Sequence, residues 1–377
     1  MKITLGEVGT YINGYAFKPS DWGTSGLPII RIQNLTNQNT IPNYFDGPYN
    51  SKFEVNKGDI LIAWSGSLGI YVWQKNKALL NQHIFRVEFN KCEIDKMYFY
   101  YAVKHNIHKM LHLTHGATMR HIIKSDFEQI IIPYPSLDVQ AKISKILNYL
   151  EQNIIYYRTI LSKLELLIKS RFVDLFGDIE LNEKKWKKIK FGELIKSANN
   201  GLARRGNDKA GNIVLRLIEL QENLINYSDP NRILLTDDEK KRYRLLEGDL
   251  LFARVNGNPK NVGRCATFYE YEEQVYHNDH IIRTSCDKSQ LDSVFAAYLF
   301  NSEYGKNRIS RKIKTSAGQY TINQDGLKSI EIILPPIVIQ YSFAEFVKQI
   351  NKLKSDVQKS IDETQLLMDS LMQEYFG

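Results

Sequence analysis

The sequence predicts an α+β protein in which two similar globular units are separated by two long helices. Three observations lead to this prediction. The chain has 377 residues, two to three times the size of a typical domain. Its second half repeats motifs of its first half in the same order, and each half ends in apolar residues at coiled-coil spacing. Hydrophobic residues make up 43% and charged residues 24%, so a mainly disordered chain is excluded.

The repeat rests on four motifs that recur along the chain. From residues 122 and 322 onward the two copies stay 200 positions apart, so the insertions fall in the earlier part of each copy. The recurring pairs are Leu5–Val8 with Phe191–Leu194, Ile30–Leu35 with Leu215–Leu220, Gly58–Leu61 with Gly248–Leu251, and Asn81–Arg86 with Asn278–Arg283.

Each globular unit mixes short strand-like runs with helical stretches, of which Asp95–Leu113 is the longest in the first unit. Asn256–Gly257 and Asp325–Gly326 are predicted to be turns. The strand order does not follow from these patterns. The strands predicted in the first unit are Pro28–Ile32, Asp59–Trp64, His83–Phe89 and Gln129–Ile132.

Each copy ends in a predicted helix of about 35 residues, or roughly 50 Å. Pro135 and Pro335 mark the point where a strand stops and the helix begins, and Gly177 and Gly377 stand at helix-stopping positions. One such helix alone would also suit a compact bundle, but two copies in register favour two helices packed on each other. The first seam is Ile143, Leu147, Leu150, Ile154, Tyr157, Leu161, Leu164 and Ile168; the second is Phe343, Val347, Ile350, Val357, Ile361 and Met368, with Lys354 and Thr364 as polar interruptions.

Charge and cysteine content restrict the function classes only slightly. Fifty Lys and Arg against 42 Asp and Glu give a net charge of +8, which suits a polyanionic partner but also plain solubility. Cys92, Cys265 and Cys286 are too few and too far apart for a disulfide framework or a four-cysteine zinc site. Because we find neither a secretory leader nor a membrane-spanning stretch, we expect the chain to be cytoplasmic.

No catalytic or metal site is predicted. The sequence lacks the phosphate-binding loop of NTPases and the Asn/Asp-Pro-Pro-Tyr/Phe tetrad of amino-methylating enzymes. Asp238–Lys241 resembles half of a nuclease site but is better explained as a solvated charge run. Five histidines lie close together in the sequence: His105, His108, His112, His115 and His121. On a helix the first four would form one stripe that could ligate zinc, although a basic face beside phosphate explains the cluster as well. For Asn81 with His83 and for Asn278 with His280, a structural hydrogen-bonding pair in both copies is favoured over a catalytic base, because no nucleophile motif accompanies them.

Residues suited to reading DNA bases gather in loops of the two units. Arg and Lys pair with guanine, and Asn and Gln pair with adenine. The loop after residue 253 is rich in these types, whereas its counterpart after residue 63 is short and uncharged, so the units are expected to read different sequences. The candidates are Arg204, Arg205, Arg254, Asn256, Asn258, Lys260, Asn261, Gln319 and Tyr320 in the second unit, and Trp64, Ser65, Ser67, Thr118, Arg120 and His121 in the first.

These motifs, in this order and duplicated, resemble the specificity (S) subunit of type I restriction-modification systems over nearly the whole chain. The resemblance implies target recognition domains at 1–134 and 178–334. It also implies spacer helices at 135–177 and 335–377 that form an antiparallel coiled coil. Each domain would read one half of a bipartite double-stranded DNA site, and the helices would set the unread spacer.

The resemblance further implies that the chemistry resides on partner chains. Two methyltransferase (M) subunits would carry S-adenosylmethionine and methylate adenine N6, and restriction (R) subunits would use ATP and Mg²⁺. This chain would hold no cofactor. An alternative of another class is a coiled-coil scaffold or an RNA-binding protein without base-specific reading, which predicts indifference to DNA sequence. A separated specificity part of a single-chain restriction enzyme would have nearly the same function.

Overall fold

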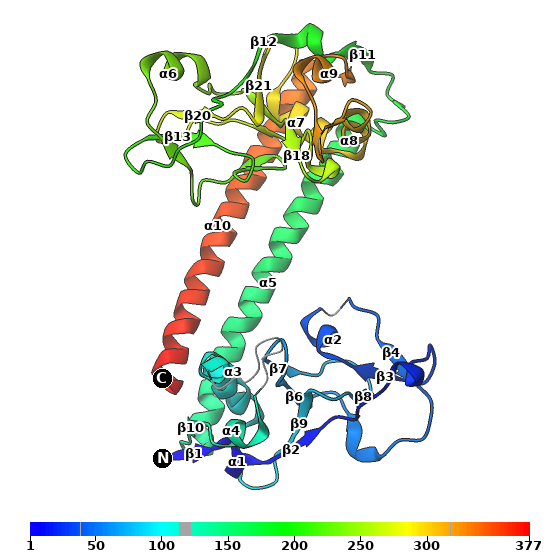
Figure 1. The fold of residues 1–377 in the computed structure, drawn as a ribbon, viewed down its shortest axis with the longest axis vertical. Coiled ribbons are helices and arrows are strands. Elements are labelled where there is room, and N and C mark those ends of the chain that lie inside the picture. The colour runs from blue at the N-terminus through cyan, green and yellow to red at the C-terminus, as the bar shows by residue number, and fades with distance from the viewer. Residues whose placement is uncertain (38, 113–121, 317) are drawn as a thin grey trace. The chain divides into compact units, whose positions relative to one another are not determined.

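The computed structural model describes residues 1–37, 39–112, 122–316 and 318–377. Two compact units are present: Met1–Ile160 with Val357–Gly377, and Leu161–Asp356. The long helices α5 (Leu137–Phe176) and α10 (Ile337–Phe376) each contribute residues to both units (Figure 1). Within the described residues, no helix is both long enough and apolar enough to cross a bilayer.

The first unit is built on two four-stranded sheets with the orders β2-β9-β6-β7 and β4-β3-β8-β5, and on the pair β1-β10. Its strands are β1 Lys2–Thr4, β2 Thr10–Asn13, β3 Leu27–Ile30, β4 Asn43–Phe45, β5 Glu54–Val55, β6 Ile60–Ala63, β7 Gly69–Val72, β8 Ala78–Leu80, β9 Ile84–Glu88 and β10 Ile131–Pro133. Its helices besides the long ones are α1 Leu5–Val8, α2 Ile32–Thr36, α3 Lys96–His112 and α4 Lys124–Glu128, with 3₁₀ turns η1 Pro19–Asp21 and η2 Ser51–Phe53.

The second unit repeats this plan with the sheets β12-β21-β17-β19 and β16-β13-β20 and the pair β11-β24, and adds β18-β23-β22 and β14-β15. Its strands are β11 Lys187–Lys190, β12 Ile195–Asn200, β13 Asn212–Leu215, β14 Leu220–Gln221, β15 Leu224–Ile225, β16 Arg232–Ile233, β17 Leu250–Ala253, β18 Val255–Asn256, β19 Cys265–Thr267, β20 Val275–His277, β21 Ile281–Cys286, β22 Lys314–Ser316, β23 Gln319–Thr321 and β24 Glu331–Leu334. Its shorter helices are α6 Asp237–Tyr243, α7 Ser293–Asn301, α8 Glu303–Ser310 and α9 Gln324–Lys328, with 3₁₀ turns η3 Phe191–Leu194 and η4 Pro259–Asn261.

The central strands explain why both copies fold alike. All four residues of β6 and all four of β17 are buried, so each is a continuous apolar run between two covered faces. In each copy the central strand pairs antiparallel with the strand that follows the repeated Asn-x-His sequence at 81–83 or 278–280; this strand is β9 in the first unit and β21 in the second. A parallel pair, β3 with β8 or β13 with β20, recurs in the second sheet. The predicted α+β class with two similar units and two long helices is therefore confirmed.

A buried glutamine ties each long helix to its globular unit. Gln140 and Gln340 are fully buried. The Oε1 atom of Gln140 accepts from the main-chain N–H of Asp95 at 3.0 Å, and that of Gln340 accepts from Asp292 at 2.9 Å. Each Nε2 donates back to the proline carbonyl five residues earlier, at 2.8 and 2.7 Å. The same pair of glutamine hydrogen bonds therefore fixes the start of the long helix in both copies.

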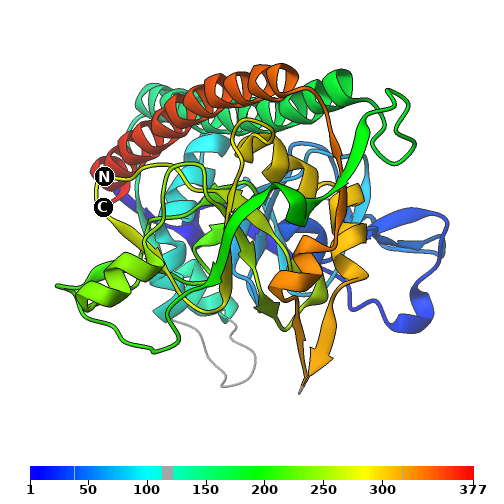
Figure 2. The same cartoon turned by 90° about the horizontal axis from the view of Figure 1, so that it is seen from above.

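The two long helices have 40 residues each, somewhat more than predicted, and run antiparallel within the second unit. Their adjoining ends lie side by side (Figure 1, Figure 2). Phe172 and Phe176, late in α5, contact Phe343, early in α10, with ring centroids 5.2 and 5.6 Å apart. The predicted seam residues are all buried or half-buried. Antiparallel packing along the predicted seam thus accounts for their apolar character.

The polar interruptions of the second seam are satisfied locally. Lys354 forms an ion pair with Glu165 of α5. The hydroxyl of Thr364 donates to the carbonyl of Ser360, one turn earlier, at 2.6 Å. The Lys354 pair joins the two helices, so this polar residue contributes to their register.

One local prediction is wrong. Asp325–Gly326, expected as a turn, lies in α9. Asn323 caps this helix because its side-chain oxygen accepts from the N–H of Gly326 at 2.8 Å. The Asp-Gly pair therefore belongs to the first turn of a short helix.

Candidate nucleic-acid interface

Trp64 and Arg254 occupy the same position in the two copies, directly after the central strands. The N–H of Trp64 donates to the carbonyl of His83 at 3.1 Å, and that of Arg254 donates to the carbonyl of His280 at 2.8 Å. The carbonyls of Trp64 and Arg254 accept from the N–H groups of residues 122 and 322, at 3.0 and 2.9 Å. In each copy, the residue at this position is therefore held by one main-chain bond from its N–H and one to its carbonyl. We call this pair of bonds the main-chain frame; it holds a tryptophan in the first unit and an arginine in the second.

A glycine lies at a close main-chain approach in each copy, at Gly14 and Gly201. A Cβ atom on Gly14 would lie 2.0 Å from the carbonyl oxygen of Asn81, and one on Gly201 would lie 2.0 Å from that of His277. No side chain fits at these approaches. This motif was not predicted from the sequence, although the Asn-Gly dipeptide at 13–14 and 200–201 is a visible signal.

The indole of Trp64 is half-buried and held in a defined orientation. Its ring stacks on Phe85 with centroids 5.6 Å apart and an interplanar angle of 22°. Its Nε1–H donates to Oδ1 of Asn13 at 3.2 Å. This arrangement presents aromatic surface that suits stacking or contact with a thymine methyl group.

The remaining candidates of the first unit differ in accessibility. Ser65 is only 3% exposed, so its hydroxyl is unavailable to a partner in this conformation. Ser67 is exposed at the tip of the same loop. Thr118, Arg120 and His121 lie outside the described residues, as does part of the histidine stripe.

Arg254 is half-buried beside His280. Its Nε–H is buried and has no hydrogen-bond partner among the described residues. An unpaired guanidinium N–H is costly, and a ligand that drew this side chain outward would relieve that cost. Burial, and then the nearby Arg205 and Arg254, hold the pKa of His280 below its usual value despite the opposing effect of Asp279. The charges of these two arginines therefore disfavour the protonated form of this imidazole.

The loop after Arg254 is ordered by its own asparagines. Asn256 pairs with Tyr320 where β18 joins β23, so two candidates distant in sequence come together. The side-chain oxygen of Asn256 accepts from the N–H of Asn258 at 2.9 Å, and that of Asn258 accepts from the N–H of Lys260 at 3.1 Å. These bonds engage the side-chain oxygens and not the amide N–H₂ groups of Asn256 and Asn258. Asn258, Lys260 and Gln319 are exposed, and Asn261 is half-buried.

Arg204 and Arg205 have different roles. Arg204 makes two bonds to the carboxylate of Glu239, at 2.8 and 2.7 Å, which tie its loop to α6. This pairing lowers the pKa of Glu239 to about 2. Arg205 bonds Asp279 at 2.7 Å and Nε2 of His280 at 3.0 Å while its side chain stays 56% exposed. Arg205 and Arg254 therefore converge on His280, whereas Arg204 mainly supports the loop.

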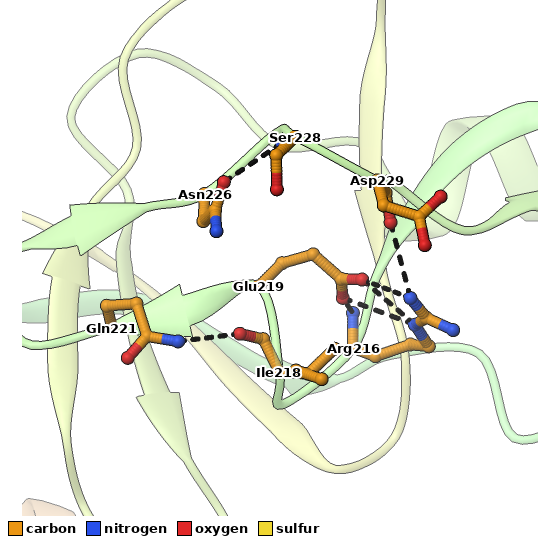
Figure 3. Close-up of polar contacts among 7 residues, drawn as sticks. All are labelled: Arg216, Ile218, Glu219, Gln221, Asn226, Ser228 and Asp229. Carbon is orange, nitrogen blue, oxygen red and sulfur yellow. Dashed lines mark hydrogen bonds and ion pairs between the residues drawn. The ribbon is translucent and has the colours of Figure 1, made fainter. Parts of the chain in front are cut away.

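A pocket of about 440 Å³ adjoins these residues and is lined in part by Arg204, Arg205, His280 and Arg216. Arg216 was not predicted as a site residue, although it lies in the repeated motif Leu215–Leu220. Figure 3 shows the guanidinium of Arg216 bonded to the carboxylate of Glu219, which is 3% exposed. The Nε–H of Arg216 donates to Oε1 of Glu219 at 3.0 Å. The main-chain N–H of Arg216 also donates to this carboxylate, at 2.6 Å. Arg216 is thus fixed at the pocket wall by a buried acid.

The arrangement suits recognition through hydrogen bonds. The three arginines at the pocket are each paired with a carboxylate, so their donors are positioned before any ligand arrives. The side chain of Asn278 accepts from the N–H of His280 at 3.1 Å, which is the structural pairing expected for this motif. Within the described ranges, no cluster of three or more His, Cys, Asp or Glu side chains could hold a metal ion.

Comparison with known proteins identifies relatives along nearly the whole chain. Residues 1–166 and 183–364 match the family model described as the type I restriction modification DNA specificity domain. The specificity subunit of type I restriction enzyme StySPI from Salmonella potsdam is 28% identical over 70% of this chain, and that of EcoBI from Escherichia coli is 21% identical over 99%. The matched region spans 60% of the StySPI subunit and 84% of the EcoBI subunit.

Two solved structures share the fold. The S subunit of a type I restriction-modification system from M. genitalium has a TM-score of 0.64 at 15% identity, covering 100% of this chain and 96% of its own. A chain from a second type I R-M system has a TM-score of 0.57 at 12% identity, covering 100% and 97%.

Proposed function

Because this chain belongs to the type I restriction-modification DNA specificity family, we propose that it selects the DNA target of such a system. Each globular unit reads one half of a bipartite site in double-stranded DNA, and the antiparallel helices set the length of the unread spacer. The segments are those expected from the sequence: recognition domains at 1–134 and 178–334, and helices at 135–177 and 335–377.

The observation that carries this proposal is the equivalence of Trp64 and Arg254. Two identical main-chain frames that hold chemically different side chains suit two readers of different sequences. Arg254 has the donors to pair with guanine O6 and N7, while Trp64 offers an apolar surface. Asn256, Asn258, Lys260 and Gln319 surround the second reader, and exposed Lys and Arg supply affinity through phosphates without sequence choice.

The partners follow from the same proposal. Two methyltransferase subunits dock on the chain and carry S-adenosylmethionine for methylation of adenine N6. Restriction subunits join them and use ATP and Mg²⁺. This chain contributes recognition and no catalytic group, and the assembly acts in the cytoplasm. The names of the relatives support this division, because they are the specificity subunits of restriction enzymes.

Methylation mapping tests the proposal. The chain is co-expressed with its methyltransferase in a host without N6-methyladenine, and the host genome is sequenced for that base. We expect one bipartite motif with a fixed gap that disappears when this chain is omitted. A scaffold or RNA-binding protein would leave the methylation pattern unchanged by its omission, which would refute the proposal.

A further inference from the structure

A pocket of about 390 Å³ lies in the first unit, between the first turn of α5 and the loop that joins β9 to α3. Its apolar lining comes from Phe89, Ile94, Leu137 and Ala141, with Glu93 and Asp95 beside them. Its volume is within the range of about 300–1,000 Å³ typical of ligand pockets. Leu137 is 43% exposed, so the apolar lining continues onto the surface of the helix.

The second unit contains the same frame around the corresponding place. Asp95 and Asp292 donate their N–H groups to the buried glutamines Gln140 and Gln340, at 3.0 and 2.9 Å. The residue after each glutamine therefore stands at the same point relative to its loop. That residue is Ala141 in the first unit and Tyr341 in the second.

Tyr341 shows what this place can hold. Its hydroxyl donates to the carbonyl of Lys288 at 2.8 Å, so this side chain, which is 46% exposed, links α10 to the loop before α7. Lys288 precedes Asp292 by four residues, as Lys91 precedes Asp95. In the first unit the alanine supplies no ring, and the pocket lies beside that alanine.

We infer that this pocket receives a tyrosine side chain from a methyltransferase partner. The ring packs on Phe89, Ile94 and Leu137, and the hydroxyl donates to the carbonyl of Lys91, as Tyr341 does to Lys288. The inference rests on the proposed function for the identity of the partner. A tyrosine is favoured over a purely apolar side chain because the tyrosine of the internal copy bonds the loop carbonyl through its hydroxyl. Tyrosine is also a residue type enriched at protein interfaces.

Two substitutions make opposite predictions for a small probe. The probe is p-cresol, the side chain of tyrosine, and its binding to the full chain is followed by saturation-transfer NMR. Ala141→Tyr fills the pocket from within and should abolish binding at this place. Tyr341→Ala opens the equivalent groove and should add a second binding site. Lys142→Tyr, on the neighbouring exposed position of α5, is the matched control and should leave probe binding unchanged. Probe binding that is absent, or unaffected by Ala141→Tyr, would overturn the inference.

Complex formation tests the source of the tyrosine. The affinity of the methyltransferase for each full-length variant is measured by isothermal titration calorimetry. We expect Ala141→Tyr to weaken binding at least tenfold and Lys142→Tyr to change it less than twofold. Equal affinity of the wild type and Ala141→Tyr would refute the inference while leaving the proposed function intact. Failure of the wild-type chain to bind any methyltransferase would instead refute both.

Discussion

Replacing Arg254 with alanine should relax discrimination in one half-site and leave the other half-site intact. If its guanidinium pairs bidentately with guanine, the substitution removes about 1–3 kcal/mol of discrimination, or roughly 5- to 150-fold. The fold should tolerate the change, because the main chain at this position keeps its bonds to His280 and Ile322. The side chain also leaves no buried carboxylate behind, since the nearby Asp279 is paired with Arg205.

Lys241→Ala is the control, since Lys241 is exposed on the same unit and is not a base-reading candidate. A lost phosphate contact should weaken binding to all sequences alike and reduce the dependence on salt by about one ion. The assay is fluorescence anisotropy at fixed salt, with duplexes that carry each base in turn at every position of both half-sites. A uniform loss of affinity for Arg254→Ala, as expected for Lys241→Ala, or no change at all, would refute base reading by Arg254.

Three further predictions concern spacing, stability and pH. Inserting four residues between 154 and 157 of α5 lengthens that helix by about 6 Å; methylation mapping should show an altered spacer with both half-site sequences unchanged, and a changed half-site would contradict the role of the helices as a ruler. Gln340→Ala leaves the Asp292 N–H and the Pro335 carbonyl without their buried partner and should lower the free energy of unfolding by about 2–4 kcal/mol in urea denaturation, whereas exposed Gln358→Ala should change it little. Burial lowers the pKa of His277 to about 4, so the folded chain binds fewer protons than the unfolded chain below pH 6.5; stability should fall as pH drops from about 6.5 to 4, by up to about 3 kcal/mol. His277→Gln should flatten this pH dependence in urea denaturation at each pH, and an unchanged dependence would contradict the role of His277.

The helices and central strands could be predicted because their patterns are local. The seam residues recur every three or four positions, and the burial of Ile143, Leu147 and Phe343 follows from that spacing. Strands β6 and β17 are short apolar runs beside a Gly-Asp pair; β6 lies within the predicted strand Asp59–Trp64, and β17 follows the repeat of that motif. In these elements the interactions that determine the structure lie within a few residues of each other along the chain.

The recognition site could be predicted only in part, because its residues come from separate segments. The pairing of Asn256 with Tyr320, and of Arg205 with Asp279, depends on how distant strands align. Arg216 was overlooked because a repeated motif indicates a shared fold but does not say which side chain reaches a pocket. The satisfaction of Lys354 by Glu165 likewise requires the register of two helices.

The main-chain frame around positions 64 and 254 has a consequence for how new specificities can arise. Its bonds involve only backbone groups of Trp64 and Arg254, and the fold already accepts an aromatic residue in one copy and a cation in the other. The side chain at this position can therefore be exchanged without loss of the main-chain bonds that hold it. A library randomised at these two codons should consist mostly of folded proteins, so selection could act on target preference almost independently of stability.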